Sequence, residues 1–324
     1  MAIRQNVLLL SAGRRVDLLR AFQMSLNSHF PRAQVFAADA DPVFSSACHI
    51  ADEAVQSPLA EAPTYIDFLL KLCEQKDIGL IVPLIDNELL ILAENRDVFG
   101  SAGTCVAVSS EKLILNCRDK RKTARVFDEL GIDRPTIFQK SEITFPCFCK
   151  PYDGSRSVGA VPLINKHELS EEMINDPKNI FMEMVGNSYD EFTIDAYFDV
   201  AANLKCLVPR QRLAVRDGEV SKAITRDNFI CDFLIDRLGN LAGARGCITI
   251  QLFANLNTHS IKALEINPRF GGGYPLTEAA GANYPDWLIR EYLKGEAITF
   301  FDKWEKNLLM LRYDAKVIVH EAYR

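Results

Sequence analysis

The sequence predicts a mixed α/β and α+β protein that begins with a Rossmann-like parallel sheet and continues into mainly strand-rich structure. Three observations support this fold class. The chain has 324 residues, which is long enough for two or three units with sizeable cores. Its first third alternates apolar strand-like runs with amphipathic helix-like runs, as parallel sheets with helices on both faces do. The rest places several strand-like segments in succession with few helices between them.

The first third contains regularly ordered elements. Strands are expected at residues 7–10, 34–38, 80–84 and 104–108, and helices at 14–30, 65–76 and 88–98. Ligands of such sheets bind beyond the carboxyl ends of the strands. The segments that follow the predicted strands, such as Ser11 to Arg15, are therefore candidates for contact with a ligand.

A capped helix opens the middle of the chain. Asp119 is a suitable N-cap, Gly131 a suitable C-cap, and Pro135 blocks continuation. Further strands are expected at 145–150, 181–185, 191–198, 246–253 and 260–267, and a helix at 283–294. We expect the first domain to end between residues 109 and 119.

Composition excludes several classes of protein. The net charge of −6 argues against a nucleic-acid binder that works through bulk positive charge. No apolar run reaches membrane-spanning length, and the short apolar start runs into Arg14 and Arg15 instead of a cleavage site. The nine cysteines form no CxxC pair, so we expect reduced core thiols in a cytoplasmic protein.

The segment Glu265-Ile-Asn-Pro-Arg269 carries the main chemical signal. Glu265 and Asn267 share one face of a strand because side chains alternate. Magnesium prefers such oxygen ligands and shares them with substrate phosphates, and Arg269 can hold a phosphate through two hydrogen bonds. If the preceding strand is an antiparallel neighbour, Gln251 joins the same face. A strand edge with incidental polar residues is the alternative.

Two other segments suit a nucleotide. Lys150 ends an apolar strand and precedes a loop of small residues that includes Gly154, Ser155, Ser157 and Gly159. Backbone N–H groups of such a loop can close over phosphates, although an ordinary glycine-serine turn is the alternative.

The second nucleotide segment starts in the strand expected at 181–185 and continues into the strand after it. Backbone groups near Met184 and Val185 can pair with an adenine edge. Glu191, Thr193 and Asp195 share a strand face, from which a carboxylate can bind ribose or orient Lys150.

Taken in order, these motifs resemble the ATP-grasp superfamily, in the branch similar to the carbamoyl-phosphate synthase large subunit. The resemblance covers essentially the whole chain. It rests on Asp119-Lys120, Lys150-Pro-x-x-Gly-Ser, Glu183 with Glu191-x-Thr-x-Asp195, Gln251, and Glu265 to Arg269. The segments Ser11–Arg15, Pro83–Glu88 and Phe270–Pro275 resemble small stand-alone proteins of that branch. The chain has one such unit, not a tandem pair, so the larger enzyme's reaction is not transferred.

The resemblance implies a role for each matching residue. Lys120 and Lys150 would hold phosphates, Gly154 to Gly159 would cover the triphosphate, Glu183 and the backbone near Val185 would meet adenine, and Glu191 would take the ribose. Gln251, Glu265 and Asn267 would ligate one or two Mg²⁺ (or Mn²⁺) ions. Arg269 would face the transferred phosphate.

The resemblance also implies domains. A Rossmann-like domain would span residues 1–112, followed by an ATP-grasp domain at 113–324 with a small lobe at about 140–185 and a larger lobe at about 186–324.

The predicted activity is an ATP- and magnesium-dependent ligase that phosphorylates a carboxylate and transfers the acyl group to an amine or a thiol. Phosphorylation of bicarbonate or carbamate is an alternative, as is a non-catalytic nucleotide-binding protein. The partners are then small molecules, with a homodimer as the expected assembly. Arg210 and Lys222 are candidate catalytic residues together with Arg269, and Arg14, Arg212 and Gly272 are candidate substrate contacts.

A dinucleotide-binding domain is the remaining alternative for the first strand, turn and helix. The GxGxxG pattern that such a domain needs is absent, since only Gly13 is present and Arg14 and Arg15 occupy the turn.

Overall fold

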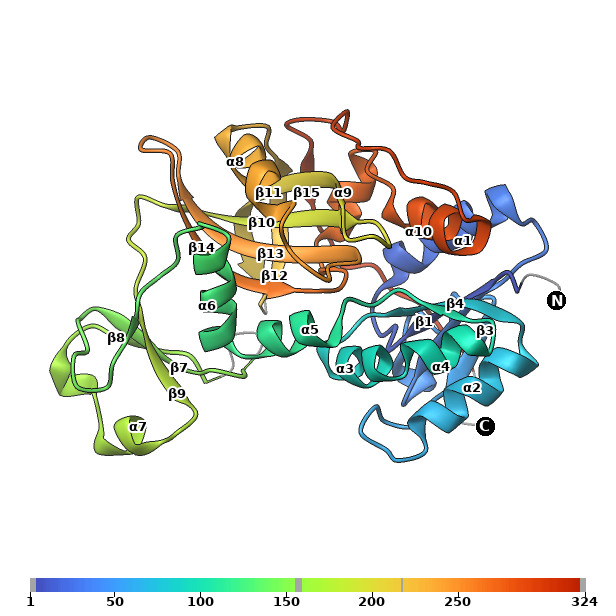
Figure 1. Ribbon diagram of the computed structural model, residues 1–324, viewed down its shortest axis with the longest axis horizontal. Coiled ribbons are helices and arrows are strands. Elements are labelled where there is room, and N and C mark those ends of the chain that lie inside the picture. The colour runs from blue at the N-terminus through green and yellow to red at the C-terminus, as the bar shows by residue number, and fades with distance from the viewer. Residues whose placement is uncertain (1–3, 155–158, 217, 321–324) are drawn as a thin grey trace.

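Three β-sheets, each formed from a different stretch of chain, organise the protein (Figure 1). The computed structural model describes residues 4–154, 159–216 and 218–320. The predicted site residues Ser155 and Ser157 lie outside these ranges. None of the helices in the described ranges is both long and apolar enough to cross a membrane.

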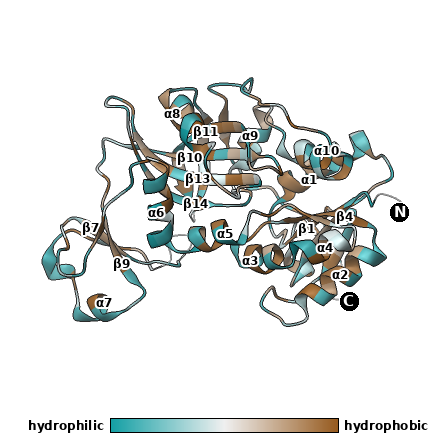
Figure 2. Cartoon of the chain, in the orientation of Figure 1, coloured by the Kyte–Doolittle hydropathy of each residue, from teal (hydrophilic) through white to brown (hydrophobic). Residues whose placement is uncertain are grey.

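The first sheet is parallel, in the order β3-β2-β1-β4-β5. Its strands are β1 (Asn6–Leu10), β2 (Val35–Asp39), β3 (Glu53–Gln56), β4 (Ile78–Pro83) and β5 (Cys105–Val106). Val7 and Leu9 of β1 pack on one side with helix α1 (Val16–His29), while Leu8 and Leu10 pack on the other with α2 (Tyr65–Gln75). Both faces are therefore buried, and Figure 2 shows β1 and β4 as hydrophobic.

Two details of this region differ from the sequence prediction. The short strand β3, with a single buried residue, Val55, was not predicted. The single helix expected at 88–98 is two helices, α3 (Asp86–Glu94) and α4 (Arg96–Ser101). The break falls at Asn95, whose side chain donates a hydrogen bond to the carbonyl of Ile91 at 2.8 Å. Asparagine side chains compete in this way with backbone hydrogen bonds and so end helices.

A four-stranded antiparallel sheet forms a small lobe that projects to one side (Figure 1). Its order is β6-β9-β7-β8, with β6 (Ile137–Phe138), β7 (Cys147–Pro151), β8 (Val161–Leu163) and β9 (Asn179–Glu183). A 3-10 turn at Lys166–Glu168 and helix α7 (Glu171–Asn175) lie between β8 and β9. A compact core of Cys147, Cys149, Leu163 and Phe181 holds the lobe together.

Two helices connect this lobe to the first sheet. They are α5 (Glu111–Arg118), which was not predicted, and α6 (Lys120–Glu129). Asp119 caps α6, as expected, because its Oδ1 accepts the N–H of Arg121 at 2.9 Å. Gly131 follows the helix with a φ of 66°, a conformation that glycine adopts readily.

The third sheet is antiparallel and carries most of the site. Its order is β14-β13-β10-β11-β12-β15. The strands are β10 (Asp190–Phe198), β11 (Leu204–Arg216), β12 (Glu219–Thr225), β13 (Gly246–Asn255), β14 (Ser260–Asn267) and β15 (Leu309–Leu311). Helices α8 (Phe229–Leu238), α9 (Tyr274–Ala279) and α10 (Tyr284–Lys294) accompany it. The expectation that β13 and β14 are antiparallel neighbours is confirmed.

Helix α10 joins this sheet to the first domain. His29 of α1 pairs with Asp286 at 2.7 Å, and Ser25 of α1 contacts Asn283 at the start of α10. On the sheet side, Trp287 packs edge-on against Tyr197 of β10. One continuous core therefore links the parallel sheet to the antiparallel sheet, and this positions the loops of the first domain over the third sheet.

Candidate active site

Strand pairing aligns the predicted polar residues in rows across the third sheet. Glu265 pairs with Gln251, Gln251 with Thr193, and Thr193 with Arg210. Paired residues on neighbouring strands project to the same face. The structure therefore brings the predicted metal ligands of β13 and β14 together on one face.

Of the predicted oxygen ligands, Asn267 and Glu265 contact each other directly. The Nδ2 of Asn267 donates to Oε1 of Glu265 at 3.0 Å. The Nε2 of Gln251 donates to Glu191, which leaves the amide oxygen of Gln251 without a hydrogen-bond donor among the described residues. One carboxylate and two amide oxygens are hard donors of the kind magnesium accepts. The donor set therefore fits a magnesium ion shared with phosphate oxygens.

The ammonium groups of Lys120 and Lys150 lie near Glu265 and make no ion pair with the residues that the structure describes. The backbone N–H of Lys120 bonds the carbonyl of Tyr152 at 2.9 Å, and its ammonium group donates to the carbonyl of Gly154. The pKa of Lys150 is lowered to about 8, chiefly by burial and also by the neighbouring Lys120, while Glu265 acts in the opposite direction. Burial likewise lowers the pKa of Lys120, against the attraction of Glu265 and other carboxylates. Two partly desolvated ammonium groups beside each other favour an anion between them.

The predicted base-binding segment follows β9. The Glu183 carboxylate accepts the Thr136 N–H at 3.0 Å and pairs with Lys262. It is therefore already engaged by the protein. The backbone groups of Met184 and Val185 make no hydrogen bond within the described ranges. These backbone groups, more than the Glu183 side chain, are the ones available to pair with a base.

Glu191 is held between two neighbours on the sheet. Its Oε1 accepts a hydrogen bond from Arg212 at 2.6 Å and another from Gln251. The Arg212 side chain is 11% exposed, and its Nε is buried without a hydrogen-bond partner in the described residues. A buried donor without a partner is costly, so this atom marks a place where a ligand acceptor would fit.

Arg269 links the third sheet to the first domain. Its Nη2 lies 2.9 Å from Oδ2 of Asp86, and 3.5 Å from Oδ1 of Asn267. Asp86 begins α3, directly after the carboxyl end of β4. Asp86 was not predicted as a site residue, although it lies in the Pro83–Glu88 segment that the resemblance singled out.

Arg210, a predicted catalytic residue that could bind a carboxylate or a phosphate, is buried. It is 1% exposed, and its Nε and Nη2 each donate to the Asp195 carboxylate at 2.9 Å. A Cβ at Gly273 would lie 2.2 Å from its Nη1, so only glycine fits there. The structure places Arg210 beneath the glycine turn, in an ion pair. Spacing in sequence indicates a strand face but not the depth of a side chain.

Lys222, predicted as a catalytic residue, lies on β12. Its side chain is exposed and makes no hydrogen bond or ion pair with any residue that the structure describes. The register between β11 and β12 shifts between Ala214 and Val215. Such an irregularity changes which side chains a strand turns to a given face, and sequence alone does not reveal it.

Arg14 and Gly272 come together at the edge of the site. Arg14 is 80% exposed and lies 3.5 Å from the carboxylate of Glu219, which also pairs with Arg312 at 3.1 Å. A Cβ at Gly272 would lie 3.4 Å from that same carboxylate. Glu219 was missed because a single acidic residue at a strand start carries no motif.

Glu88 adds a buried carboxyl group near the end of β1. It is 2% exposed, and its Oε1 accepts hydrogen bonds from Ser11 at 2.6 Å and Tyr65 at 3.0 Å. Its Oε2 is buried without a hydrogen-bond partner in the described residues. Burial raises its pKa from 4.5 to about 7, against the effect of these hydrogen bonds.

This shift predicts a pH effect on stability. Between about pH 4.5 and 7 the unfolded chain ionises at residue 88 before the folded chain does, so the free energy of unfolding falls as pH rises. Glu88→Gln removes this titration but keeps an oxygen acceptor. From pH 5 to pH 8 the variant should gain about 2 kcal/mol relative to the unsubstituted protein. Urea unfolding at both pH values measures this, with the exposed Glu74→Gln as control. Equal pH dependence in all three proteins would contradict the prediction.

Comparison with known proteins agrees with this geometry. A family described as the PylC-like N-terminal domain matches residues 7–107, and one described as ATP-grasp in the biosynthetic pathway with Ter operon matches residues 175–311. No curated protein matches the sequence.

Solved structures are similar over nearly the whole chain. One is the biotin carboxylase domain of Hydrogenobacter thermophilus 2-oxoglutarate carboxylase, a dimer with MgADP, ADP and bicarbonate (TM-score 0.72, 17% identity, 95% of this chain and 74% of that chain). Another is Staphylococcus aureus N5-carboxyaminoimidazole synthetase with ADP (TM-score 0.70, 14% identity, 96% and 81%). A third is the Bacillus licheniformis L-amino acid ligase (TM-score 0.67, 16% identity, 91% and 75%). Residues 175–311 therefore match an ATP-grasp family, and the chain as a whole shares its fold with these solved structures.

Proposed function

We propose that the protein is an ATP- and magnesium-dependent ligase that joins a carboxylate to an amine through an acyl phosphate and releases ADP and phosphate. One observation carries the proposal. The ammonium groups of Lys120 and Lys150, which make no ion pair within the described ranges, lie near Glu265. Glu265 contacts Asn267, and the Arg269 guanidinium is 3.5 Å from Asn267. Cations, magnesium ligands and a guanidinium around one position suit the transfer of a phosphoryl group.

Each residue has a role in this reaction. Lys120 and Lys150 hold the phosphates of ATP. Glu265, Asn267 and Gln251 would hold magnesium, which would offset the negative charge of the phosphates during transfer. A carboxylate oxygen attacks the γ-phosphorus, and the bond to the bridging oxygen breaks to release ADP. The amine then attacks the acyl carbon, loses a proton, and the carbon–oxygen bond to phosphate breaks.

Arg269 is suited to the transferred group. Its fork of N–H donors matches the oxygens of a phosphate or carboxylate. Its ion pair with Asp86 holds the guanidinium at 2.9 Å from the first domain, so closure of the domains and placement of this charge are coupled. Positioning of this kind supplies much of the rate in phosphoryl transfer.

The edge of the site near the glycine turn suits a small molecule with both charges. Arg14 and Arg312 lie beside Glu219, and Gly272 leaves the approach open. Alternating positive and negative side chains are complementary to an amino acid, which carries a carboxylate and an ammonium group. The L-amino acid ligase among the similar structures supports an amino acid as one substrate.

Two alternatives predict different products. A non-catalytic nucleotide binder would release no ADP, and phosphorylation of bicarbonate or carbamate would release ADP without any amino acid. ADP release measured against pooled amino acids, sugar acids, amines and bicarbonate separates these outcomes, followed by mass spectrometry of the product. A condensed product whose mass equals the two substrates minus water supports the ligase. ADP release with bicarbonate alone, or none with any pool, would contradict it.

The proposed assembly is a homodimer, and the proposed location is the cytoplasm. The similar 2-oxoglutarate carboxylase domain is a dimer, which supports a homodimer for this chain. All nine cysteines are free thiols, which supports a reducing compartment such as the cytoplasm. Light scattering coupled to size exclusion tests the first statement directly.

A further inference from the structure

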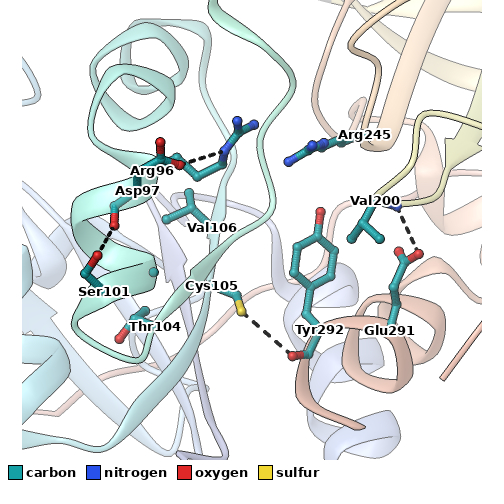
Figure 3. Close-up of a pocket in the computed structure, with 11 residues that line it drawn as sticks. Arg96, Asp97, Ser101, Thr104, Cys105, Val106, Val200, Arg245, Glu291 and Tyr292 are labelled. Atoms are coloured by element: carbon teal, nitrogen blue, oxygen red, sulfur yellow. Dashed lines mark hydrogen bonds and ion pairs between the residues drawn. The ribbon is translucent and has the colours of Figure 1, made fainter. Parts of the chain in front are cut away.

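A cavity of about 600 Å³ lies between the parallel first sheet with its helices and the antiparallel third sheet with its helices (Figure 3). It is separate from the nucleotide site. Its walls come from α4 and β5 on one side and from α10 and the start of β13 on the other. Thr104 at its floor donates a hydrogen bond to the carbonyl of Ile78, the first residue of β4. The cavity is therefore at the amino edge of the parallel sheet, whereas Asp86 and Ser11 follow the carboxyl ends.

Two arginines from different domains enter this cavity. Figure 3 shows the guanidinium groups of Arg96 and Arg245 pointing toward one another. The Arg245 side chain makes no hydrogen bond or ion pair with residues in the described ranges; only its backbone N–H is engaged, by Ser109 at 3.2 Å. The nearest carboxylate to Arg96 is that of Asp97, 4.0 Å from its Nε on a fully exposed side chain. Two cationic side chains that converge with so little negative charge beside them favour the binding of an anion.

A tyrosine hydroxyl below the arginines is also without a partner. The Tyr292 hydroxyl is buried and makes no hydrogen bond in the described part of the chain. Burial and the carboxylate of Glu291 raise the pKa of Tyr292, while Arg245 and Arg96 act in the opposite direction. The hydroxyl therefore stays protonated and can donate. A buried donor without an acceptor is rare in folded proteins and indicates a missing ligand or water.

The Glu291 carboxylate borders the cavity and already accepts two hydrogen bonds from the protein. Glu291 accepts hydrogen bonds from the Tyr197 hydroxyl at 2.9 Å and the Val200 N–H at 3.0 Å. Figure 3 shows it turned toward Val200. It does not neutralise the arginines by contact. The remaining surface near Val106 and Val200 is apolar, so the cavity combines a cationic end with an apolar wall.

We propose that this cavity is a second binding site, for a small organic anion with a phosphate or carboxylate group held by Arg96, Arg245 and the Tyr292 hydroxyl. The volume is in the range of small-molecule sites. Since the ligand would bridge α4 of the first domain to α10 and β13, its binding would stabilise their contact. Since it binds at the opposite edge of the sheet, it would not compete with ATP.

Binding of two probes, inorganic phosphate and citrate, tests the proposal. Calorimetry is done with the nucleotide site filled by the magnesium complex of AMP-PNP, so that phosphate cannot occupy that site. We expect saturable binding of at least one probe to the unsubstituted protein. Arg245→Gln and Arg96→Gln should each raise its Kd at least about tenfold, as loss of a charge-assisted hydrogen bond does. Arg125→Gln, the same change at an exposed arginine of α6, should leave Kd unchanged.

Tyr292→Phe distinguishes a ligand contact from a structural role. Without a probe the variant should melt at the same temperature or higher, because it loses a buried donor that has no partner. With the probe it should gain less in melting temperature than the unsubstituted protein. The proposal is overturned if neither probe binds at millimolar concentration, if Arg245→Gln binds as well as Arg125→Gln, or if Tyr292→Phe keeps the full shift.

Discussion

Replacing Glu265 by glutamine should reduce ADP formation by about 10²–10³-fold while the fold stays intact. The substitution keeps the shape and an oxygen that can accept the hydrogen bond from Asn267, now 3.0 Å. It removes the one negative charge among the proposed magnesium ligands. It also removes the carboxylate that raises the pKa of both Lys120 and Lys150 against the effect of burial. The nucleotide site therefore loses metal affinity and ammonium charge together.

Turnover of MgATP and the melting temperature measure this effect side by side. Glu74→Gln on the exposed face of α2 makes the same chemical change far from the site and serves as control. A folded Glu265→Gln protein that forms ADP at the original rate would exclude the proposed role of this strand. Loss of folding would be visible as a lower melting temperature and would not count as loss of catalysis.

The second prediction is that ADP binding weakens at high pH through Lys150. Burial and the neighbouring Lys120 lower the pKa of Lys150 to about 8, so the ammonium form is lost as pH rises through that value. Phosphates bind the charged form. If only that form binds, the affinity for ADP should fall by about tenfold between pH 7 and pH 9. The measurement is made without magnesium, so that only charges of the chain act on the nucleotide.

Two variants test the assignment to Lys150. Lys150→Arg keeps a cation that does not titrate in this range, and its ADP affinity should change little with pH. Lys150→Met removes the charge and should bind ADP weakly at both values, by about 1.5–3 kcal/mol less than the protein with a charged lysine. A pH dependence that persists in Lys150→Arg would assign the titration to another group, such as Lys120.

Local sequence patterns were sufficient for much of the fold. The buried strand β1, the capped helix α6 and the strands β13 and β14 were predicted close to their observed bounds. Apolar periodicity and capping residues act over a few neighbours, so they can be read from the chain directly. The short strand β3 and helix α5 were missed, because so few residues carry little pattern of their own.

The candidate site also contains residues whose arrangement the sequence predicts and residues that only the packing of distant segments brings together. Glu265 and Asn267 share a face because alternation along a strand is a local property, and Gln251 joins them through one hairpin-like pairing. The contact of Arg269 with Asp86 spans 183 positions of the chain and follows from the packing of two domains. The burial of Arg210 follows from Asp195 on β10, from Thr277 in α9 and from the space that Gly273 leaves just before α9.

The sequence by itself determined the order of the motifs that resemble the ATP-grasp superfamily and the strand face that Glu265 and Asn267 share, because each depends on residue type and spacing along the chain. The tertiary structure alone decided which charges remain without a partner. Lys120 and Lys150 lie near Glu265 and make no ion pair among the described residues, and Arg96 and Arg245 converge in a separate cavity at the amino edge of the parallel sheet. Whether a charge is neutralised depends on groups that distant segments bring within a few ångströms, and only the packed chain determines those distances.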